Sequence, residues 1–141
     1  MKVNNNKSGF TLLEIIIVII IVGVLASLAL PKFFSTVEYS RSTEALNTLG
    51  VIRSSIERCA LMAGNDYTNC DFNVLDIEDP NGAAGAHFAY VITQGAVDGD
   101  FVIVATRNAI DGGNGTDTIT LTVDDTTGVS RSGTGSFQAI Q

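Results

Sequence analysis

The chain has 141 residues, of which 45% are hydrophobic, and a formal net charge of −7. This length fits one ordinary domain plus an extended segment and excludes two ordinary domains. Nucleic-acid-binding proteins cluster Lys and Arg against phosphates, whereas the 8 Lys and Arg here are scattered among 15 Asp and Glu, so no direct nucleic-acid binding is expected.

The chain begins with a short polar segment that is followed by a long apolar one. Residues 1–9, MKVNNNKSG, include Lys2 and Lys7, and residues 10–30 carry a single formal charge, at Glu14. As a helix, residues 10–30 would be about 31 Å long, which matches the hydrocarbon thickness of a bilayer. A helix satisfies its own backbone in lipid, so helix is predicted here despite the β-branched run. The two lysines favour a cytoplasmic N-terminus, with the rest of the chain outside.

The residues alone leave two interpretations of this segment open. Small residues at Ala26-Ser27-Leu28-Ala29 resemble a signal-peptidase site, and a cut there would release a secreted binding module without the apolar segment. In the other interpretation, the apolar segment is retained as a membrane helix.

Glu14 also has two interpretations. It lies only about 6 Å from the start of the apolar stretch, so its carboxylate can reach the interface. In the second interpretation it waits for a positive partner from another molecule, because a carboxylate at the centre of a membrane helix costs about 2.5–3.5 kcal/mol.

The N-terminal residues resemble those of type IV pilins and of their relatives, the pseudopilins of type II secretion. The resemblance rests on Lys7-Ser8-Gly9, on Phe10-Thr11-Leu12-Leu13-Glu14, on the Ile/Val/Leu run that follows, and on Pro31 after it. It covers residues 1–35 closely and the general plan of the rest. The joint occurrence of these parts is far more specific than a lone short motif.

The resemblance implies how the N-terminus is processed and used. Residues 1–9 would be a leader, which a membrane-embedded prepilin peptidase removes by cutting between Gly9 and Phe10 and methylating the new amine of Phe10. Residues 10–31 would then stay on the mature chain as a transmembrane and filament-core helix. The resemblance also implies an assembly role for Glu14, whose carboxylate would meet the N-terminal amine of a neighbouring subunit.

Residues 32–63 are predicted to continue the helix as an amphipathic half, bent near Pro31. Apolar residues recur there at spacings of three and four, which is one stripe of a helix, and Gly64 suits a helix C-cap. The stripe, which is expected to bury against the strands, consists of Ala45, Leu49, Ile52, Ile56, Cys59 and Ala63.

The two cysteines, Cys59 and Cys70, are separated by ten residues. A small exported domain gains stability from a disulfide, so a Cys59–Cys70 bridge is predicted; two unlinked buried thiols are the alternative. Turn-forming residues over 64–86 predict a loop, and the bridge would pin this loop to the helix end.

Residues 87–141 are expected to form an antiparallel sheet. Strands are predicted at 87–93, 101–106 and 118–123, with a fourth at about 128–132. The fold class is therefore α+β: a long N-terminal α-helix, with a membrane or filament half and an amphipathic half, packed against a small sheet of three or four strands.

One loop offers oxygen ligands at intervals of three, with glycines between them: Asp111, Asn114 and Asp117. This spacing makes it a calcium candidate, although it lacks the terminal Glu of a helix–loop–helix site. A flexible Gly-rich connection is the favoured alternative, and no other cofactor is expected. The single histidine, His87, is expected to be a surface or sheet residue. No catalytic constellation is recognised, so the chain is not expected to be an enzyme.

The leading functional hypothesis is a type IV pilin-like structural subunit that polymerises as a helical homo-oligomer into an extracellular pilus for adhesion, motility or uptake. It would begin as a single-pass precursor in the bacterial inner membrane, with the prepilin peptidase and the inner-membrane assembly machinery as partners. The alternative is the major pseudopilin of a type II secretion system, in a periplasmic pseudopilus. Because major pseudopilins commonly hold calcium in a C-terminal loop, calcium at residues 111–117 would favour this alternative. An electron-conducting fibre is a lesser hypothesis, because the aromatic residues on the helix are typical of packing: Phe10, Phe33, Phe34 and Tyr39.

Overall fold

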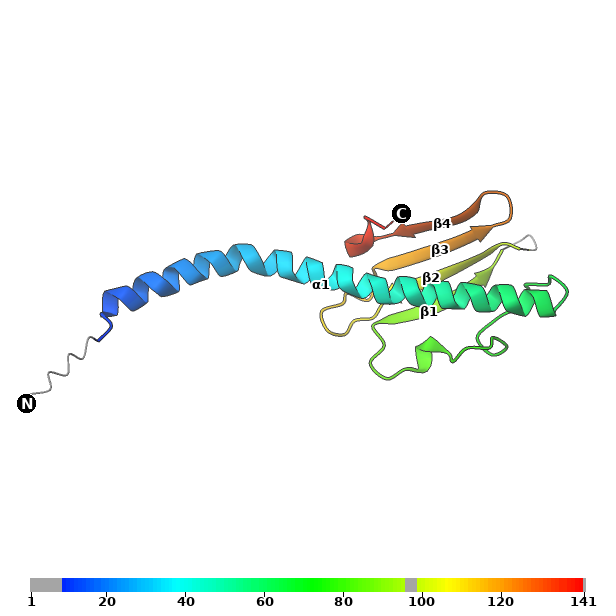
Figure 1. Cartoon of the computed structure of the whole chain (residues 1–141), viewed down its shortest axis with the longest axis horizontal. Helices are drawn as coiled ribbons and strands as arrows, with labels where there is room; N and C mark the ends of the chain where they lie inside the picture. Colours follow the sequence, from blue (N-terminus) through cyan, green and yellow to red (C-terminus); the bar gives the residue numbers. More distant parts are fainter. Residues whose placement is uncertain (1–8, 96–98, 141) are drawn as a thin grey trace, which may run out of the picture. The chain divides into compact units, whose positions relative to one another are not determined.

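The computed structural model describes residues 9–95 and 99–140. The chain divides into two compact units, an N-terminal unit, Met1–Thr36, and a head unit, Val37–Gln141. One long helix, α1 (Leu12–Met62), contributes to both units and includes Pro31 in its interior (Figure 1). The predicted helix of about 10–63 is therefore confirmed apart from its first and last residues. Of the predicted leader, residues 1–8 lie outside the described residues.

Local signals at both ends of α1 explain where it begins and ends. At the N-terminus, the Glu14 N–H donates to Thr11 Oγ1 at 3.2 Å, as in the capping pattern of Thr followed three residues later by Glu. At the C-terminus, Gly64 has a φ of 76°, and the Asn65 N–H donates to the Ala60 carbonyl at 2.7 Å. A left-handed glycine with this hydrogen bond is a Schellman ending, which confirms the helix C-cap predicted at Gly64.

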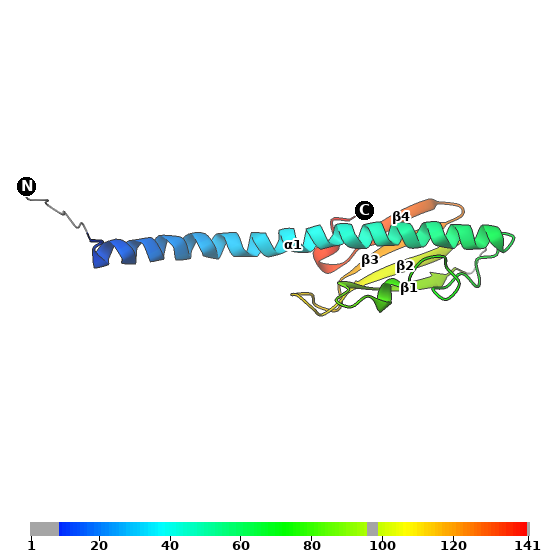
Figure 2. The same cartoon turned by 60° about the horizontal axis from the view of Figure 1, so that its bottom comes forward.

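The head unit contains a four-stranded antiparallel sheet in the order β1-β2-β3-β4. Its strands are β1 (Phe88–Gln94), β2 (Phe101–Arg107), β3 (Thr118–Asp124) and β4 (Gly128–Gly133). All four predicted strands are present, with ends that differ by one residue at most. The head-unit part of α1 lies across one face of this sheet, which gives two layers (Figures 1 and 2).

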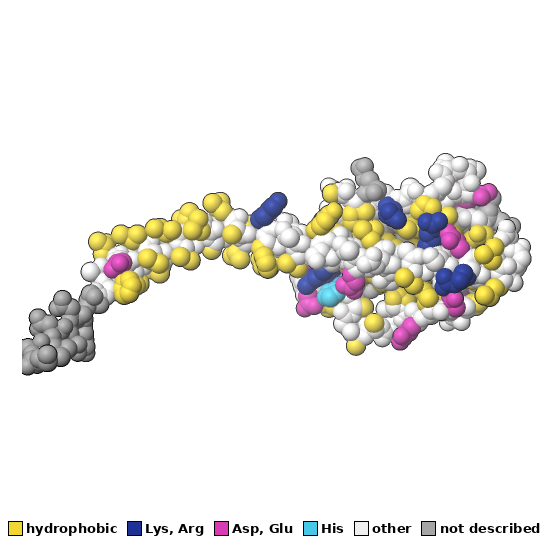
Figure 3. Space-filling view, in the orientation of Figure 1, with side chains coloured by type: hydrophobic (Ala, Val, Ile, Leu, Met, Phe, Trp, Pro, Cys, Tyr) yellow, Lys and Arg dark blue, Asp and Glu magenta, His cyan; other side chains and the backbone are white. Residues whose placement is uncertain are grey.

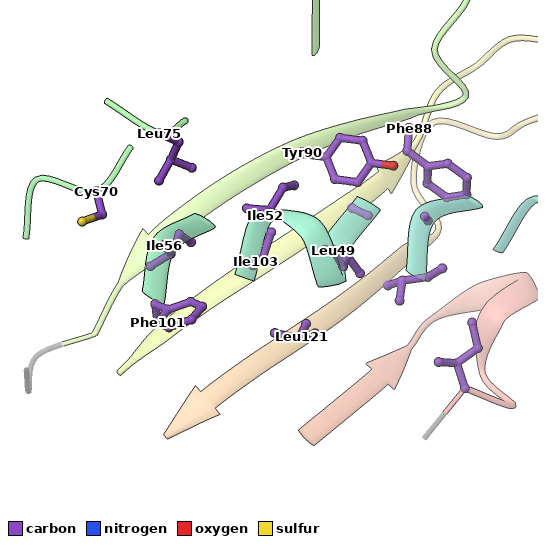
Figure 4. Packing of buried hydrophobic residues seen from close by; sticks show 14 of the residues in the cluster. Leu49, Ile52, Ile56, Cys70, Leu75, Phe88, Tyr90, Phe101, Ile103 and Leu121 are labelled. Carbon is purple, nitrogen blue, oxygen red and sulfur yellow. The ribbon is translucent and has the colours of Figure 1, made fainter. Parts of the chain in front are cut away.

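The core lies between the helix stripe and the inward-facing residues of β1, β2 and β3. Figure 4 shows Leu49, Ile52 and Ile56 of α1 among the sheet side chains, including Ile103 and Leu121. These side chains are fully or almost fully buried, and burial of this kind is the main force that holds the two layers together.

The predicted stripe is wrong at its last position, because Ala63 is exposed. Cys59 is half-buried and packs against the core, whereas Ala60, which the prediction left out, is fully buried. The next residue on the same helix face as Ile56 is the one four positions on, because a straight helix has 3.6 residues per turn. Cys59 therefore faces the side of the helix where the following loop passes.

The connection from α1 to β1 covers the free edge of the sheet at β1. It contains a short 3-10 helix, η1 (Pro80–Gly82), capped by Asp79, whose carboxylate accepts from the Asn81 N–H at 2.9 Å. The Asn81 side chain accepts from the Tyr90 N–H at 2.7 Å and donates to the Tyr90 carbonyl at 3.0 Å. A side chain thus takes the place of a fifth strand at this point of the edge.

Candidate assembly site

The N-terminal unit presents an apolar helix that no described residue of the unit covers. The structure describes one helix long and apolar enough to cross a membrane, and none of the residues in its most apolar segment is buried. Hydrophobic side chains line this segment in Figure 3. Exposed apolar surface on this scale marks contact with lipid or with another protein.

The residues of the predicted cleavage site precede this helix. Gly9 and Phe10 lie before the first turn of α1, both are exposed, and the Phe10 side chain retains 80% of its accessible surface. Among the residues that the structure describes, no atom lies within 4 Å of the place where a Cβ on Gly9 would be. Both residues of the predicted cleavage site are therefore exposed in the described part of the chain.

Glu14 lies in the first turn of α1. A carboxylate there interacts favourably with the positive end of the helix dipole. Within residues 9–95 and 99–140, its carboxylate forms no hydrogen bond or ion pair. Glu14 thus has a local helix-starting role, and its carboxylate has no partner among the residues that the structure describes.

The predicted disulfide is present in the head unit. Cys59, near the end of α1, is bonded to Cys70, with their Cα atoms 5.9 Å apart. Cys70 is 1% exposed and belongs to the hydrophobic core. The bridge ties the connection between α1 and β1 to the helix, as expected from the sequence.

A second polar cluster, which sequence reasoning missed, centres on Arg107 at the end of β2. Its side chain is 1% exposed, and its guanidinium pairs with both carboxylate oxygens of Glu38 on α1, at 3.0 and 3.3 Å. Glu38 also pairs with Arg41 at 2.8 Å. The hydrogen bond from Arg107 is the largest cause that lowers the pKa of Glu38 from its ordinary value.

A signal for Arg107 exists in the alternation of β2. Residues 101, 103 and 105 point into the core, so the same period places residue 107 inward. A buried Arg needs an anionic partner. Glu38 could not be singled out, because it lies 69 residues away among several acids of the same helix.

The side-chain oxygens of the calcium candidates have partners within the protein. Asn114 donates to the Asp117 carboxylate at 2.6 Å, and that carboxylate also accepts from the Ser136 N–H at 2.8 Å. These hydrogen bonds lower the pKa of Asp117, and the bond from Asn114 is the largest cause. The Asp111 carboxylate lies elsewhere, 3.5 Å from Nε2 of His87. No group of three or more His, Cys, Asp or Glu suited to a metal occurs in the described residues, and calcium stays the less favoured interpretation of this loop.

His87 is half-buried just before β1, where its Nδ1 lies 3.1 Å from Glu44 on α1. Its ring therefore stands between two carboxylates, those of Glu44 and Asp111. His87 thereby joins the helix to the loop after β2.

Comparison with known proteins is informative for the N-terminal part. Residues 4–30 match the family model described as the prokaryotic N-terminal methylation motif. The type IV major fimbrial protein FimA of Dichelobacter nodosus is 34% identical over 64 residues, which are 45% of this chain and 40% of that protein. A probable minor fimbrial protein of the same organism is 40% identical over 67 residues, which are 45% of this chain and 42% of that protein.

A secretion protein is similar as well. The type II secretion system core protein G of Escherichia coli (strain K12) is 35% identical over 57 residues, which are 40% of this chain and 39% of that protein. The chain thus spans about two fifths of the length of these curated relatives. No solved structure matches the chain. Residues 4–30 thus carry the methylation motif, and the chain is similar over 40–45% of its length to type IV fimbrial proteins and to a type II secretion protein.

Proposed function

We propose that this chain is a non-enzymatic structural subunit that polymerises through its N-terminal helix into an extracellular pilus for adhesion, motility or uptake. The observation that carries the proposal is the uncovered apolar helix of the N-terminal unit, which has one formal charge, at Glu14, between residues 10 and 30. Such a helix is stable in lipid, but outside lipid its apolar surface must be covered. Copies of the same helix supply that cover in a filament.

The subunit begins as a single-pass precursor in the inner membrane. The prepilin peptidase removes residues 1–9 and methylates the amine of Phe10. Support comes from the methylation motif over residues 4–30 and from the exposure of Gly9 and Phe10. The inner-membrane assembly machinery then draws the helix out of the bilayer into the fibre.

Glu14 acts during this transfer by pairing with the N-terminal amine of a neighbouring subunit. Its carboxylate is exposed and makes no ion pair within the described residues. In the apolar interior of a fibre, an amine without its carboxylate costs about 3–5 kcal/mol, so a subunit lacking the acid is disfavoured at the growing end.

The mature N-terminus tests the processing step. Intact-mass and N-terminal analysis of the chain from a strain with an active prepilin peptidase should give a chain that starts at methylated Phe10. In a peptidase-deficient strain, residues 1–9 should remain. A mature chain that starts beyond Leu28 in both strains would contradict the proposal and indicate a secreted module.

Electron microscopy tests the assembly step. Cells that express the chain with its assembly machinery should carry surface fibres that antibodies to the head unit decorate. A correctly processed chain that stays in the inner membrane without forming any fibre would contradict polymerisation.

A second candidate is the major pseudopilin of a type II secretion system, favoured by the similarity to core protein G. Short periplasmic fibres that appear only when a secretion machine is present would support it. A Tm of the head unit that depends on calcium would also support the pseudopilin. The calcium-chelation measurement described below for the wild type tests for this dependence.

A further inference from the structure

The guanidinium of Arg107 is enclosed by five oxygen atoms. Nε and Nη2 donate to the two carboxylate oxygens of Glu38, at 3.0 and 3.3 Å. Nη1 donates to the carbonyls of His87 and Asn108, at 3.1 and 3.0 Å, and Nη2 donates to the carbonyl of Ile110 at 3.1 Å. These five bonds use all five N–H groups that an arginine has.

The five oxygens come from three parts of the head unit. Glu38 belongs to α1, His87 precedes β1, and Asn108 and Ile110 follow β2. A carboxylate offering both oxygens, together with several backbone carbonyls, is the kind of oxygen set that binds a hard cation such as calcium. Here the positive charge that these oxygens surround is the guanidinium of Arg107, a side chain of the protein itself.

We propose that Arg107 is a built-in cation, whose guanidinium occupies an oxygen-lined cation site and holds residues 108–113 against α1 and β1. The inference concerns the head unit alone and does not rest on pilus assembly. The head unit consequently needs no metal ion to order this loop. With the Arg107 side chain shortened, the site takes a free guanidinium ion.

Gly113 shows how closely the loop wraps the guanidinium. A Cβ at this position would lie 2.8 Å from Cζ and Nη1 of Arg107 and 2.0 Å from the Asn108 carbonyl oxygen. Only glycine lets the backbone pass so close. The Gly113 N–H donates to the Ile110 carbonyl at 2.9 Å, so the same carbonyl binds the guanidinium and closes the turn.

The geometry favours a planar cation over a spherical one. The five oxygens surround three nitrogens spread over the guanidinium plane, each at about the length of an N–H···O hydrogen bond. Calcium needs its oxygens within about 2.3–2.6 Å of a single point. The Phe88 ring, whose centroid is 5.8 Å from Cζ, adds a cation–π contact that also favours guanidinium.

Chemical rescue of Arg107→Ala tests the proposal. Thermal unfolding of the full chain in detergent, followed by circular dichroism, should show a Tm loss of about 10 °C or more. Guanidinium chloride well below denaturing concentration should recover part of this loss in Arg107→Ala and none in the wild type. Sodium chloride at equal ionic strength and urea, a neutral molecule of the same shape, should recover nothing.

Several results would overturn the proposal: an Arg107→Ala chain as stable as the wild type, or rescue by urea as large as rescue by guanidinium. Rescue by calcium at lower concentration than guanidinium would also overturn it. In the wild type, chelation of calcium should leave Tm and hydrogen exchange of the Asn108 and Gly113 amides unchanged, and a lower Tm or faster exchange would mean that a metal orders the loop.

A second pair of variants keeps the test decisive if Arg107→Ala does not fold. Arg107→Lys retains the charge with three donors, and Arg107→Met has similar length without charge. The Tm should fall in the order Arg, Lys, Met. A Lys variant that is no more stable than the Met variant would contradict a cation site.

Discussion

Glu38 and Arg107 are 69 residues apart in the chain, and the guanidinium of Arg107 donates to both carboxylate oxygens of Glu38. Glu38 is the second residue of the head unit, whose first residue is Val37. The pair therefore fastens the far end of β2 to α1 where the head unit starts. Because Arg107 is 1% exposed, loss of its anionic partner would leave a buried charge without compensation.

Acid titration should reveal the contribution of Glu38. The pKa of Glu38 is lowered from 4.5, chiefly by the hydrogen bond from Arg107. A carboxyl group whose pKa is lowered by folding stabilises the folded state at pH values above its pKa in the unfolded chain. This contribution is lost as the pH falls through the pKa in the folded state. The free energy of unfolding should therefore decrease progressively as the pH falls below about 4.5, the unfolded value.

Glu38→Gln isolates this contribution. It should lower the free energy of unfolding at pH 7 by about 2–3 kcal/mol and make the decrease in acid smaller than in the wild type. Denaturant titrations across pH measure both effects, with the exposed Glu78→Gln as control, expected within about 0.5 kcal/mol of wild type. An acid profile of Glu38→Gln parallel to that of the wild type would contradict the assignment. Part of the acid sensitivity should remain in the variant, because other carboxyl groups also have lowered pKa values: Asp66, Asp76, Asp117 and Asp124.

Replacement of Asn81 should open the edge of the sheet at β1. Asn81→Ala removes the two hydrogen bonds to the backbone of Tyr90, so the head unit should lose about 1–3 kcal/mol. The variant should also aggregate faster, because an exposed edge pairs with other chains. Light scattering and denaturant titration check these effects, with Asn73→Ala as control, since no hydrogen bond of the Asn73 side chain occurs within the described part of the chain. Equal stability and aggregation in both variants would exclude an edge-blocking role.

Loss of the disulfide should release the connection between α1 and β1. Replacing Cys59 and Cys70 by Ala should cost about 2–4 kcal/mol, the usual range for closing a loop of this size. Hydrogen exchange should rise most in residues 66–76, and reduction of the wild type should reproduce the effect. Uniformly faster exchange throughout the sheet, with no excess in this loop, would show that the bridge acts on the whole fold.

Removal of the charge at Glu14 should block fibre growth without harming the head unit. Glu14→Gln should reduce surface fibres about tenfold or more, because the incoming amine would be buried without an anion. Fibres counted by electron microscopy and chain retained in the inner membrane give the measurement. The control Glu78→Gln should assemble normally. Wild-type fibre numbers in Glu14→Gln would refute the pairing.

Much of the fold follows from periodicity and turn residues. The spacing of Leu49, Ile52 and Ile56 predicted the buried face of α1. Alternation predicted β3, and turn residues beside the other runs predicted β1, β2 and β4, because each of these signals depends on neighbours in the chain. Gly64 marked the helix end for the same local reason. The disulfide could be predicted because only two cysteines are present.

The arrangement of the loop after β2 could not be predicted in the same way. Glycines and acids at 111–117 are compatible with a metal loop and with a loop closed by hydrogen bonds, and local sequence does not separate the two. The decisive partner is Glu38, brought in by the packing of α1 on the sheet. The full burial of Ala60 was missed because steps of three and of four from Ile56 both fit a helix face, and the step of three leads to Cys59.

The Asn81 cap limits how the heads of neighbouring copies can join. A β-sheet can continue from copy to copy without limit only if each copy has two different free edges. One edge of each copy then pairs with the other edge of the next copy. With β1 blocked at Tyr90 by the Asn81 side chain, β4 is the edge of the described sheet that has no such block. Two β4 strands can pair only about a two-fold axis, and such a pair is complete after two molecules. Strand pairing between heads is thereby self-limiting, while stacking of apolar helices has no such end point.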